Sequence, residues 1–340
     1  MFIKALLLSL LLLVITSVNS AEVVVQRSAS AQIIPIQEIQ WSFFKNPDNW
    51  IKRHKIKSVV VYKEGKIIYE SYSVGSSSTK FLGQSMTKTL TALVVGIAYD
   101  EKKINIDDPI ENYLPEMVGT PLGKVSIRNH LKMSSGSELN QQNIGKYGKI
   151  TSSNSWQQTQ TIQAQGKVFN YDSQSSILLS KLISEIYKKP LSSVWEEKVW
   201  SKLGTEYDAS WETTPRGLTV GSRGYSATSR DWIKISQLWL ENQSIVSTEW
   251  LDQMIRDKIK LTRSYDGNWS RYHNPTHYGY QIWIKENKWF SLAGKGGNKL
   301  LIDKKSKTAI LVTSVDGDWN DDGIGWFEWL TEQSLDSLIK

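Results

Sequence analysis

The sequence predicts an α+β fold, in which an antiparallel sheet is flanked by helices and carries a mostly helical inserted domain. Strand-like runs near the end of the chain, at 278–284, 299–303 and 309–315, resemble the β-rich run at 58–72. The region between them, from about 105 to 255, contains short helical patterns and loops rich in Ser and Gly. We therefore expect one sheet assembled from distant parts of the chain, with the middle of the chain as the insert.

The N-terminal residues have the layout of a secretory signal peptide. Lys4 precedes an apolar run at 5–15, interrupted only by Ser9, and small or weakly polar residues follow at 18–21. This run of about 11 residues is shorter than the roughly 20 that span a bilayer, and no cysteine follows that could carry a lipid. We expect cleavage near Ala21, export to the periplasm or the medium, and no stable membrane anchor.

The remaining elements follow from local patterns. Glu64-Gly65 is predicted as the turn of a β-hairpin. A helix is predicted to begin at Ser85 and to run through Ile97, because apolar residues recur at helical spacing, and an amphipathic helix at 326–339 closes the chain. The expected parts are a signal peptide at 1–20, a polar lead-in at 21–50 and a domain at 51–340, with a body at about 51–100 and 256–340 around a helical insert at about 101–255.

The composition limits the chemistry that is available. The 340 residues include no cysteine, which excludes a disulfide scaffold, a thiolate zinc site and a cysteine nucleophile. Lys and Arg number 41 against 34 Asp and Glu, and the net charge of +7 is scattered along the chain, so we expect no nucleic-acid partner. Covalent catalysis is left to Ser, Thr, Lys, Asp or Tyr.

Ser85 and Lys88 form an S-x-x-K pattern at the start of the predicted helix. Three residues apart on a helix, the two side chains share one face and can reach each other. A helix N-terminus favours developing negative charge on the serine, and a partly desolvated lysine can act as a base. The same spacing recurs at 42–45, 77–80 and 337–340, and an N-cap serine with an exposed lysine explains the local pattern equally well.

Further segments, in a fixed order, extend this pattern. After Ser85–Lys88 they are 106–115, 127–136, Tyr171-Asp172-Ser173, 224–231 and 294–297. Together they resemble the serine beta-lactamase and penicillin-binding-protein superfamily, in the branch that includes class C beta-lactamases, D-alanyl-D-alanine carboxypeptidases, esterases and 6-aminohexanoate-dimer hydrolases. The resemblance covers most of the chain and implies a beta-lactamase/transpeptidase-like fold.

The resemblance also implies a role for each matching residue. Ser85 is expected to be the nucleophile that forms an acyl-enzyme, with Lys88 as its base and Tyr171 as the phenol that carries a proton to the leaving group. Lys295 matches the lysine of the third motif, and the backbone N–H groups of Ser85 and Asn298 are expected to form the oxyanion hole. A cation at Lys295 is expected to lower the pKa of both Lys88 and Tyr171, which favours a phenolate.

Two positions depart from the family's motifs. Ser173 stands where the second motif has asparagine, and Gly296 stands where the third motif has a hydroxyl residue before Gly297. Both changes remove groups that recognise beta-lactams and D-alanyl peptides, so we expect a hydrolase of small esters or amides that uses Ser173, Lys295, Gly297 and Asn298 to bind substrate. A D-alanyl-D-alanine carboxypeptidase, a class C-type beta-lactamase and a non-catalytic envelope binding protein stay as alternatives, and the oligomeric state is left open.

Histidine and acidic clusters give weaker signals. His130 fits packing better than catalysis. His273 and His277 form H-x-x-x-H, but the Asn-Pro pair between them argues against a helix that aims both at one metal. The acidic residues at 318–328 resemble the start of a calcium loop, although a capped helix start fits better because the last acid lies one residue early. We expect neither a metal nor a cofactor.

Overall fold

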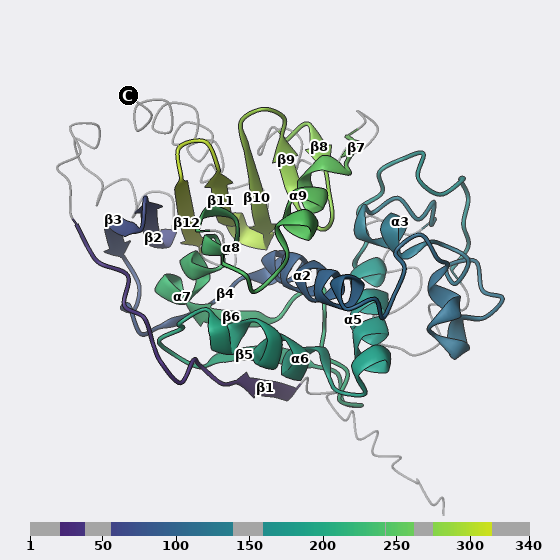
Figure 1. Cartoon of the computed structure of the whole chain (residues 1–340), viewed down its shortest axis with the longest axis horizontal. Helices are drawn as coiled ribbons and strands as arrows, with labels where there is room; N and C mark the ends of the chain where they lie inside the picture. The colour runs from purple at the N-terminus through teal and green to yellow at the C-terminus, as the bar shows by residue number, and fades with distance from the viewer. Residues whose placement is uncertain (1–20, 38–55, 139–158, 242, 262–274, 315–340) are drawn as a thin grey trace, which may run out of the picture.

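The computed structural model describes residues 21–37, 56–138, 159–241, 243–261 and 275–314. Its largest element is a sheet of eight strands in the order β3-β2-β12-β11-β10-β9-β8-β7, in which every neighbouring pair is antiparallel (Figure 1). The strands are β2 (Ile56–Lys63), β3 (Lys66–Tyr72), β7 (Ile259–Lys260), β8 (His277–Tyr278), β9 (Trp283–Lys285), β10 (Trp289–Gly294), β11 (Asn298–Asp303) and β12 (Thr308–Ser314). The predicted α+β class is confirmed.

The β2–β3 hairpin forms where it was predicted. Glu64 and Gly65 make its two-residue turn with φ of 47° and 86°, and such a turn requires positive values at both positions. β2 also pairs with β12, where Val60 lies opposite Leu311 and both side chains are buried. The strands predicted near the two ends of the chain therefore lie side by side in one sheet.

A second, smaller sheet has the order β1-β5-β6-β4. Its strands are β1 (Ala21–Val25), β5 (Ala209–Thr213), β6 (Tyr225–Thr228) and β4 (Lys80–Leu82). The sequence patterns indicated no strand in the lead-in or in the middle of the chain, so β1, β5 and β6 are findings of the structure. After β1, the Ser28 N–H donates to Thr205 Oγ1 and the Thr205 N–H donates to Ser28 Oγ, each at 2.9 Å, which ties the lead-in to the fold.

Helices surround and separate the two sheets. They are α2 (Thr87–Asp100), α3 (Ile127–Leu131), α5 (Ser173–Tyr187), α6 (Leu191–Lys198), α7 (Ser229–Lys234), α8 (Gln237–Leu240) and α9 (Thr248–Arg256). Figure 1 shows α2 in the middle of the fold, and its side chains are buried from Thr87 to Ala98. Trp250 of α9 lies so close to α2 that a Cβ at Gly96 would be 2.1 Å from the indole ring. Only glycine fits at this helix crossing.

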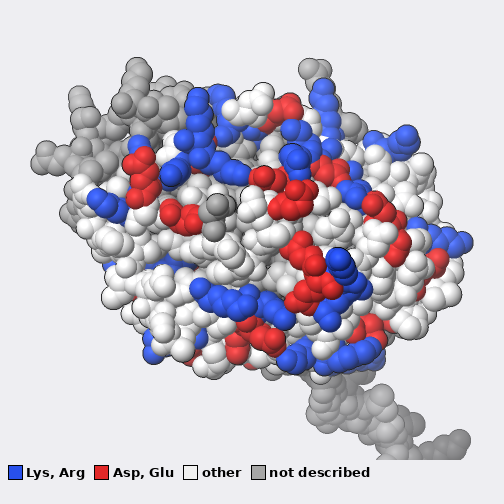
Figure 2. Space-filling view, in the orientation of Figure 1, with Lys and Arg blue, Asp and Glu red and all other residues white. Residues whose placement is uncertain are grey.

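The surface mixes charges of both signs. Figure 2 shows Lys and Arg side chains interspersed with Asp and Glu over the face in view. In the described ranges, no helix combines the length and the apolar character needed to cross a membrane. The predicted signal peptide, the acidic residues at 318–328 and the closing helix at 326–339 lie outside the described residues.

Candidate active site

Ser85 lies where β4 leads into α2. A 3-10 turn, Gln84–Met86, comes first, and the chain becomes α-helical at Thr87, so the helix predicted from Ser85 begins with this tighter turn. The Thr87 hydroxyl donates to the Gln84 carbonyl oxygen at 2.7 Å. The backbone around Ser85 is therefore held by a hydrogen bond from the first turn of α2.

The end of β10 passes close to the same turn. A Cβ at Gly294, the last residue of β10, would lie 2.2 Å from the Gly83 carbonyl oxygen and 3.1 Å from the Ser85 backbone nitrogen. No side chain fits between the two backbones, so a glycine is required here. This close approach places the start of the third motif next to Ser85.

Lys88 is buried beside Ser85. Its Nζ is hydrogen-bonded to Ser85 Oγ at 3.1 Å and to the Ser222 carbonyl oxygen at 2.8 Å, and the side chain is 2% exposed. Burial lowers the pKa of Lys88 to about 7; Asp172 opposes this shift and Arg223 adds to it. The alternative of an N-cap serine beside an exposed lysine is wrong, because Lys88 is buried and neither helical start uses Ser85 as its cap.

Tyr171 completes the group around Ser85. Its hydroxyl is hydrogen-bonded to Ser85, and Lys88 Nζ lies 5.1 Å from the centre of its ring. Burial raises the pKa of Tyr171 above its ordinary value, because the loss of hydration outweighs the hydrogen bond with Ser85. The expected phenolate is therefore wrong, and Tyr171 is a neutral phenol that can donate a proton.

Aromatic side chains from the large sheet position this phenol. Trp283 of β9 stacks on Tyr171 with 5.5 Å between ring centres and 27° between ring planes. Tyr278 of β8 meets the same ring edge-on at 6.1 Å, and Phe169 lies at 6.4 Å. The sequence could not show which of its many aromatic residues lie at the site, since β8 and β9 reach Tyr171 only through the tertiary fold.

Asp172 is the residue of this site whose importance the sequence patterns missed. As the N-cap of α5, it accepts a hydrogen bond at Oδ1 from the Ser175 backbone N–H at 2.7 Å, and its Oδ2 lies 3.1 Å from Ser175 Oγ. It is 2% exposed, and burial raises its pKa to about 6. An aspartate before an apolar helical run is a recognisable cap signal, but its burial beside Lys88 is not. Ser173, predicted to bind substrate, is the partly exposed first residue of α5.

The third-motif residues form the turn between β10 and β11. Gly296 and Gly297 have φ of 80° and 85°, values that favour glycine. The buried Asn298 side chain donates to the Lys295 carbonyl oxygen at 2.7 Å and accepts from the Ser314 N–H at 3.1 Å. Its amide therefore fixes the turn, while substrate contacts of Lys295, Gly297 and Asn298 stay predictions.

Arg223, rather than Lys295, is the cation that acts on Lys88. Lys295 is exposed, and the charges that shift the pKa of Lys88 come from Asp172 and Arg223. Arg223 follows Ser222 in the chain, and Glu212 holds its guanidinium through two hydrogen bonds at 2.8 and 3.1 Å. The expected electrostatic role of Lys295 is thus wrong, because the third-motif turn leaves its side chain in solvent.

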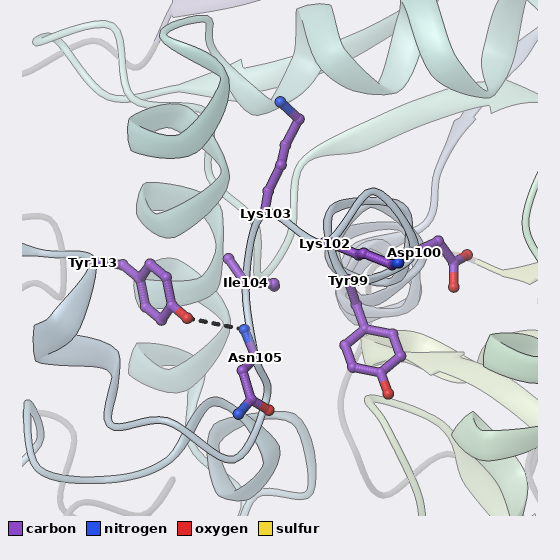
Figure 3. Close-up of a pocket in the computed structure, with 7 residues that line it drawn as sticks. All are labelled: Tyr99, Asp100, Lys102, Lys103, Ile104, Asn105 and Tyr113. Atoms are coloured by element: carbon purple, nitrogen blue, oxygen red, sulfur yellow. Dashed lines mark hydrogen bonds between the residues drawn. The ribbon is translucent and has the colours of Figure 1, made fainter.

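A cavity of about 530 Å³ lies at the opposite end of α2 from Ser85 (Figure 3). Tyr99 and Asp100 from the end of α2 line it together with Tyr113, whose hydroxyl accepts a hydrogen bond from the Asn105 N–H at 2.9 Å. None of the side chains around Ser85 lines this cavity. It is therefore separate from the site at Ser85.

The structure describes part of the predicted histidine and acidic clusters. His130 is fully buried, and His277 lies in β8, while His273 and 318–328 fall outside the described residues. Within the described ranges, no three or more His, Asp or Glu side chains come close enough to hold a metal ion.

Comparisons with known proteins show the family of the chain. The Beta-lactamase family model matches residues 52–333. A 6-aminohexanoate-dimer hydrolase from Paenarthrobacter ureafaciens is 21% identical over 280 residues, which cover 75% of this chain and 71% of the relative. A teichoic acid D-alanine hydrolase from Staphylococcus aureus is 27% identical over 191 residues, 50% of this chain and 46% of the relative.

Solved structures share the fold. The octameric penicillin-binding protein homologue from Pyrococcus abyssi has a TM-score of 0.67 at 17% identity, over 86% of this chain and 75% of that chain. Since the family model also spans most of the sequence, the chain belongs to the beta-lactamase family and is a serine hydrolase of the esterase and amidase type.

Proposed function

We propose that the protein is an exported hydrolase that cleaves small esters or amides through an acyl-enzyme on Ser85. The observation that carries the proposal is the contact of 3.1 Å between Ser85 Oγ and the buried Lys88 Nζ, since burial lowers the pKa of Lys88 to about 7. An amine that is neutral near physiological pH can accept a proton from a serine hydroxyl. The signal-like residues at 1–20 support export.

The proposed reaction uses three side chains. Lys88 takes the hydroxyl proton as Ser85 Oγ attacks the carbonyl carbon, and a tetrahedral oxyanion forms. When this intermediate collapses, the bond to the leaving group breaks and Tyr171, a neutral phenol, gives its proton to the leaving oxygen or nitrogen. The proton held by Lys88 then restores the phenol. Water hydrolyses the acyl ester by the reverse sequence of transfers and regenerates the Ser85 hydroxyl.

The binding groups favour simple esters and amides over beta-lactams. Ser173 and Gly296 lack the amide and the hydroxyl that the resemblance leads us to expect at these positions. The names of the relatives do not separate these classes, since they include a 6-aminohexanoate-dimer hydrolase, a teichoic acid D-alanine hydrolase and a beta-lactamase. Because of the groups missing at Ser173 and Gly296, we place short-chain esters and linear amides ahead of penicillins as substrates.

A fluorophosphonate probe tests the nucleophile. Folded wild-type protein is expected to give a covalent adduct that peptide mass spectrometry places on Ser85, and Ser85→Ala is expected to give none. Absence of an adduct in folded wild type would overturn the proposal and favour a non-catalytic binding protein. Circular dichroism of both proteins provides the folding control.

A substrate panel tests the specificity. Short-chain esters, nitrocefin and a D-alanyl-D-alanine peptide are compared by kcat/KM, and we expect the esters to rank first. Dominant activity on the D-alanyl peptide would show that the losses at Ser173 and Gly296 are compensated elsewhere. For export, N-terminal sequencing of the protein recovered outside the cytoplasm is expected to begin near Ala21, and a full-length N-terminus in that fraction would contradict cleavage.

A further inference from the structure

Asp172, Ser175 and His130 form a buried hydrogen-bonded chain that begins beside Lys88 and Tyr171. Asp172 Oδ2 lies 3.1 Å from Ser175 Oγ, which lies 3.1 Å from His130 Nδ1. At the far end, His130 Nε2 lies 3.1 Å from the Leu122 carbonyl oxygen. The three side chains are 2%, 1% and 0% exposed, respectively. Because these groups are buried, one atom of each contacting pair must carry a hydrogen and donate it to the other.

These contacts fix the number of protons that the three side chains share. A carbonyl oxygen only accepts, so His130 Nε2 must carry a hydrogen, and Nδ1 of a neutral imidazole then accepts. The Ser175 hydroxyl has one hydrogen to give. If it goes to His130 Nδ1, the contact between Ser175 Oγ and Asp172 Oδ2 needs a hydrogen on the carboxyl group. If it goes to Asp172, His130 must be a doubly protonated cation.

In both arrangements the three side chains therefore hold one proton more than they would with an ionised Asp172 and a neutral His130. With an ionised Asp172 and a neutral His130, one of the contacts at 3.1 Å would bring two lone pairs together. Such an unsatisfied contact between buried polar groups is costly. The remaining question is which of the two residues carries the proton.

The surroundings favour Asp172. Burial lowers the pKa of His130 to about 4, whereas burial raises the pKa of Asp172 to about 6 even while the Ser175 hydroxyl donates to its carboxylate. When that hydrogen goes to His130 Nδ1 instead, this lowering effect is lost and the pKa of Asp172 rises further. A neutral carboxyl group still accepts the Ser175 N–H at Oδ1, so the cap of α5 is kept. Two effects oppose this: the N-terminus of α5 and a positively charged Lys88 both favour an ionised Asp172. The effect of Lys88 disappears when its amine is neutral.

We propose that the resting enzyme keeps this proton on Asp172, so that a neutral carboxylic acid lies beside the neutral amine of Lys88. Asp172 is then a positioning residue: an ionised Asp172 would favour the ammonium form of Lys88, which cannot take the Ser85 proton, whereas a neutral Asp172 does not. The titratable and charged groups around this pair are Tyr171 ahead of α5, His130 from α3 and Arg223 ahead of β6. The consequence for catalysis rests on the proposed role of Lys88, whereas the protonation state does not.

Infrared spectroscopy tests the protonation state without any substrate. In a difference spectrum at neutral pH, Asp172→Asn is expected to remove the carbonyl stretch of a protonated carboxyl group. Asp231→Asn is the matched control: Asp231 is also fully buried, but it accepts hydrogen bonds from the Glu206 and Tyr207 N–H groups at 2.7 and 3.0 Å and forms an ion pair with Lys234 at 3.5 Å. This control is expected to remove no such band. Absence of the band in wild type overturns the proposal even if the enzyme is fully active.

Nitrogen NMR of His130 provides a second test. A neutral ring with its hydrogen on Nε2 is expected at neutral pH. An imidazolium ion would place the shared proton on His130 and overturn the assignment to Asp172. Both measurements stand if Ser85 turns out to be unreactive, so a failure of the proposed function is distinguishable from a failure of this inference.

The pH dependence of Ser85 labelling connects the proton to catalysis. Asparagine mimics the neutral acid, because its Oδ1 accepts and its Nδ2 donates a hydrogen bond as the carboxyl O–H did. Asp172→Asn is therefore expected to leave unchanged the pH at which the labelling rate is half its maximum on the acid side. If Asp172 is ionised in wild type, removal of its negative charge lowers the pKa of Lys88 instead. A downward shift of the midpoint by about one pH unit, a tenfold effect on the protonation equilibrium, would overturn the proposal.

Discussion

The Ser222 carbonyl oxygen accepts a hydrogen bond from Lys88 Nζ at 2.8 Å, while the same nitrogen lies 3.1 Å from Ser85 Oγ. A neutral amine has two hydrogens and one lone pair. Because a carbonyl oxygen can only accept, one hydrogen of Lys88 points to Ser222, and the lone pair is free to face the Ser85 hydroxyl. A backbone oxygen thus orients the proposed base without adding a charge to the site.

Replacement of this base is expected to abolish most of the acylation. Lys88→Met fills the same apolar space but cannot accept a proton, so the rate of Ser85 labelling should fall by about 10²–10⁴-fold. Stopped-flow or gel-based labelling with the fluorophosphonate measures the rate. Lys234→Met is the matched control, because Lys234 is also buried and bonds the Gly204 carbonyl oxygen at 2.7 Å away from Ser85. Equal labelling of wild type and Lys88→Met would contradict the assignment.

The pH profile is expected to have an acid limb set by Lys88. Burial lowers its pKa to about 7, so kcat/KM should rise as the pH increases through about 7 and the amine loses its proton. Arg223 adds to this lowering, so Arg223→Gln should raise the pKa of Lys88 and move the midpoint to higher pH. Lys295→Gln should leave the midpoint in place. A midpoint that follows Lys295 instead of Arg223 would contradict the electrostatics described above.

The contact between α2 and α9 predicts a large effect of a small substitution. Gly96→Ala would bring a methyl group to 2.1 Å from the Trp250 ring, so we expect a loss of about 1–3 kcal/mol in the free energy of unfolding. Urea denaturation measures it. In a Trp250→Leu background the added methyl group has space, and its cost should shrink or vanish. An equal loss in the free energy of unfolding in both backgrounds would show that the Trp250 ring is not the cause.

The lead-in is expected to stabilise the folded protein. Ser28→Ala removes the oxygen that accepts the Thr205 backbone N–H, which leaves this buried group unpaired and should cost about 1–3 kcal/mol. The double variant Ser28→Ala/Thr205→Val should cost less than the sum of the single variants, because the contact of 3.2 Å between the two hydroxyl groups is lost in each single variant and can be lost only once. Thermal melts of the four proteins complete the cycle, and strict additivity would show that the two residues act independently.

Local sequence patterns predicted the features that depend on residues a few positions apart in the chain. The Ser85–Lys88 contact follows from a helical spacing, and Glu64-Gly65 follows from the backbone demands of a hairpin turn. Contacts between distant segments were beyond such patterns. His130 reaches Asp172 through Ser175, and no local periodicity relates residues of α3 to the start of α5.

Electrostatics were the least predictable part of the site. The third motif identified a lysine by its place in the sequence, but the effect of a charge depends on the direction of its side chain and on the depth of its burial. Lys295 points into solvent, whereas Arg223 acts on the buried Lys88. Strand β1 was missed for a related reason, since its partner, β5, follows much later in the chain.

The pairing of β2 with β12 also sets the moment at which the protein can fold. Ser58 lies opposite Thr313, so the ribosome must make the chain as far as β12 before β2 and β12 can pair. Pairings of such long range slow folding, and a chain that lacks its last strand exposes the edge that this strand will cover. With the export that we propose, this order of strands would delay completion of the fold until the C-terminal strands arrive, and so would keep the chain unfolded during transport.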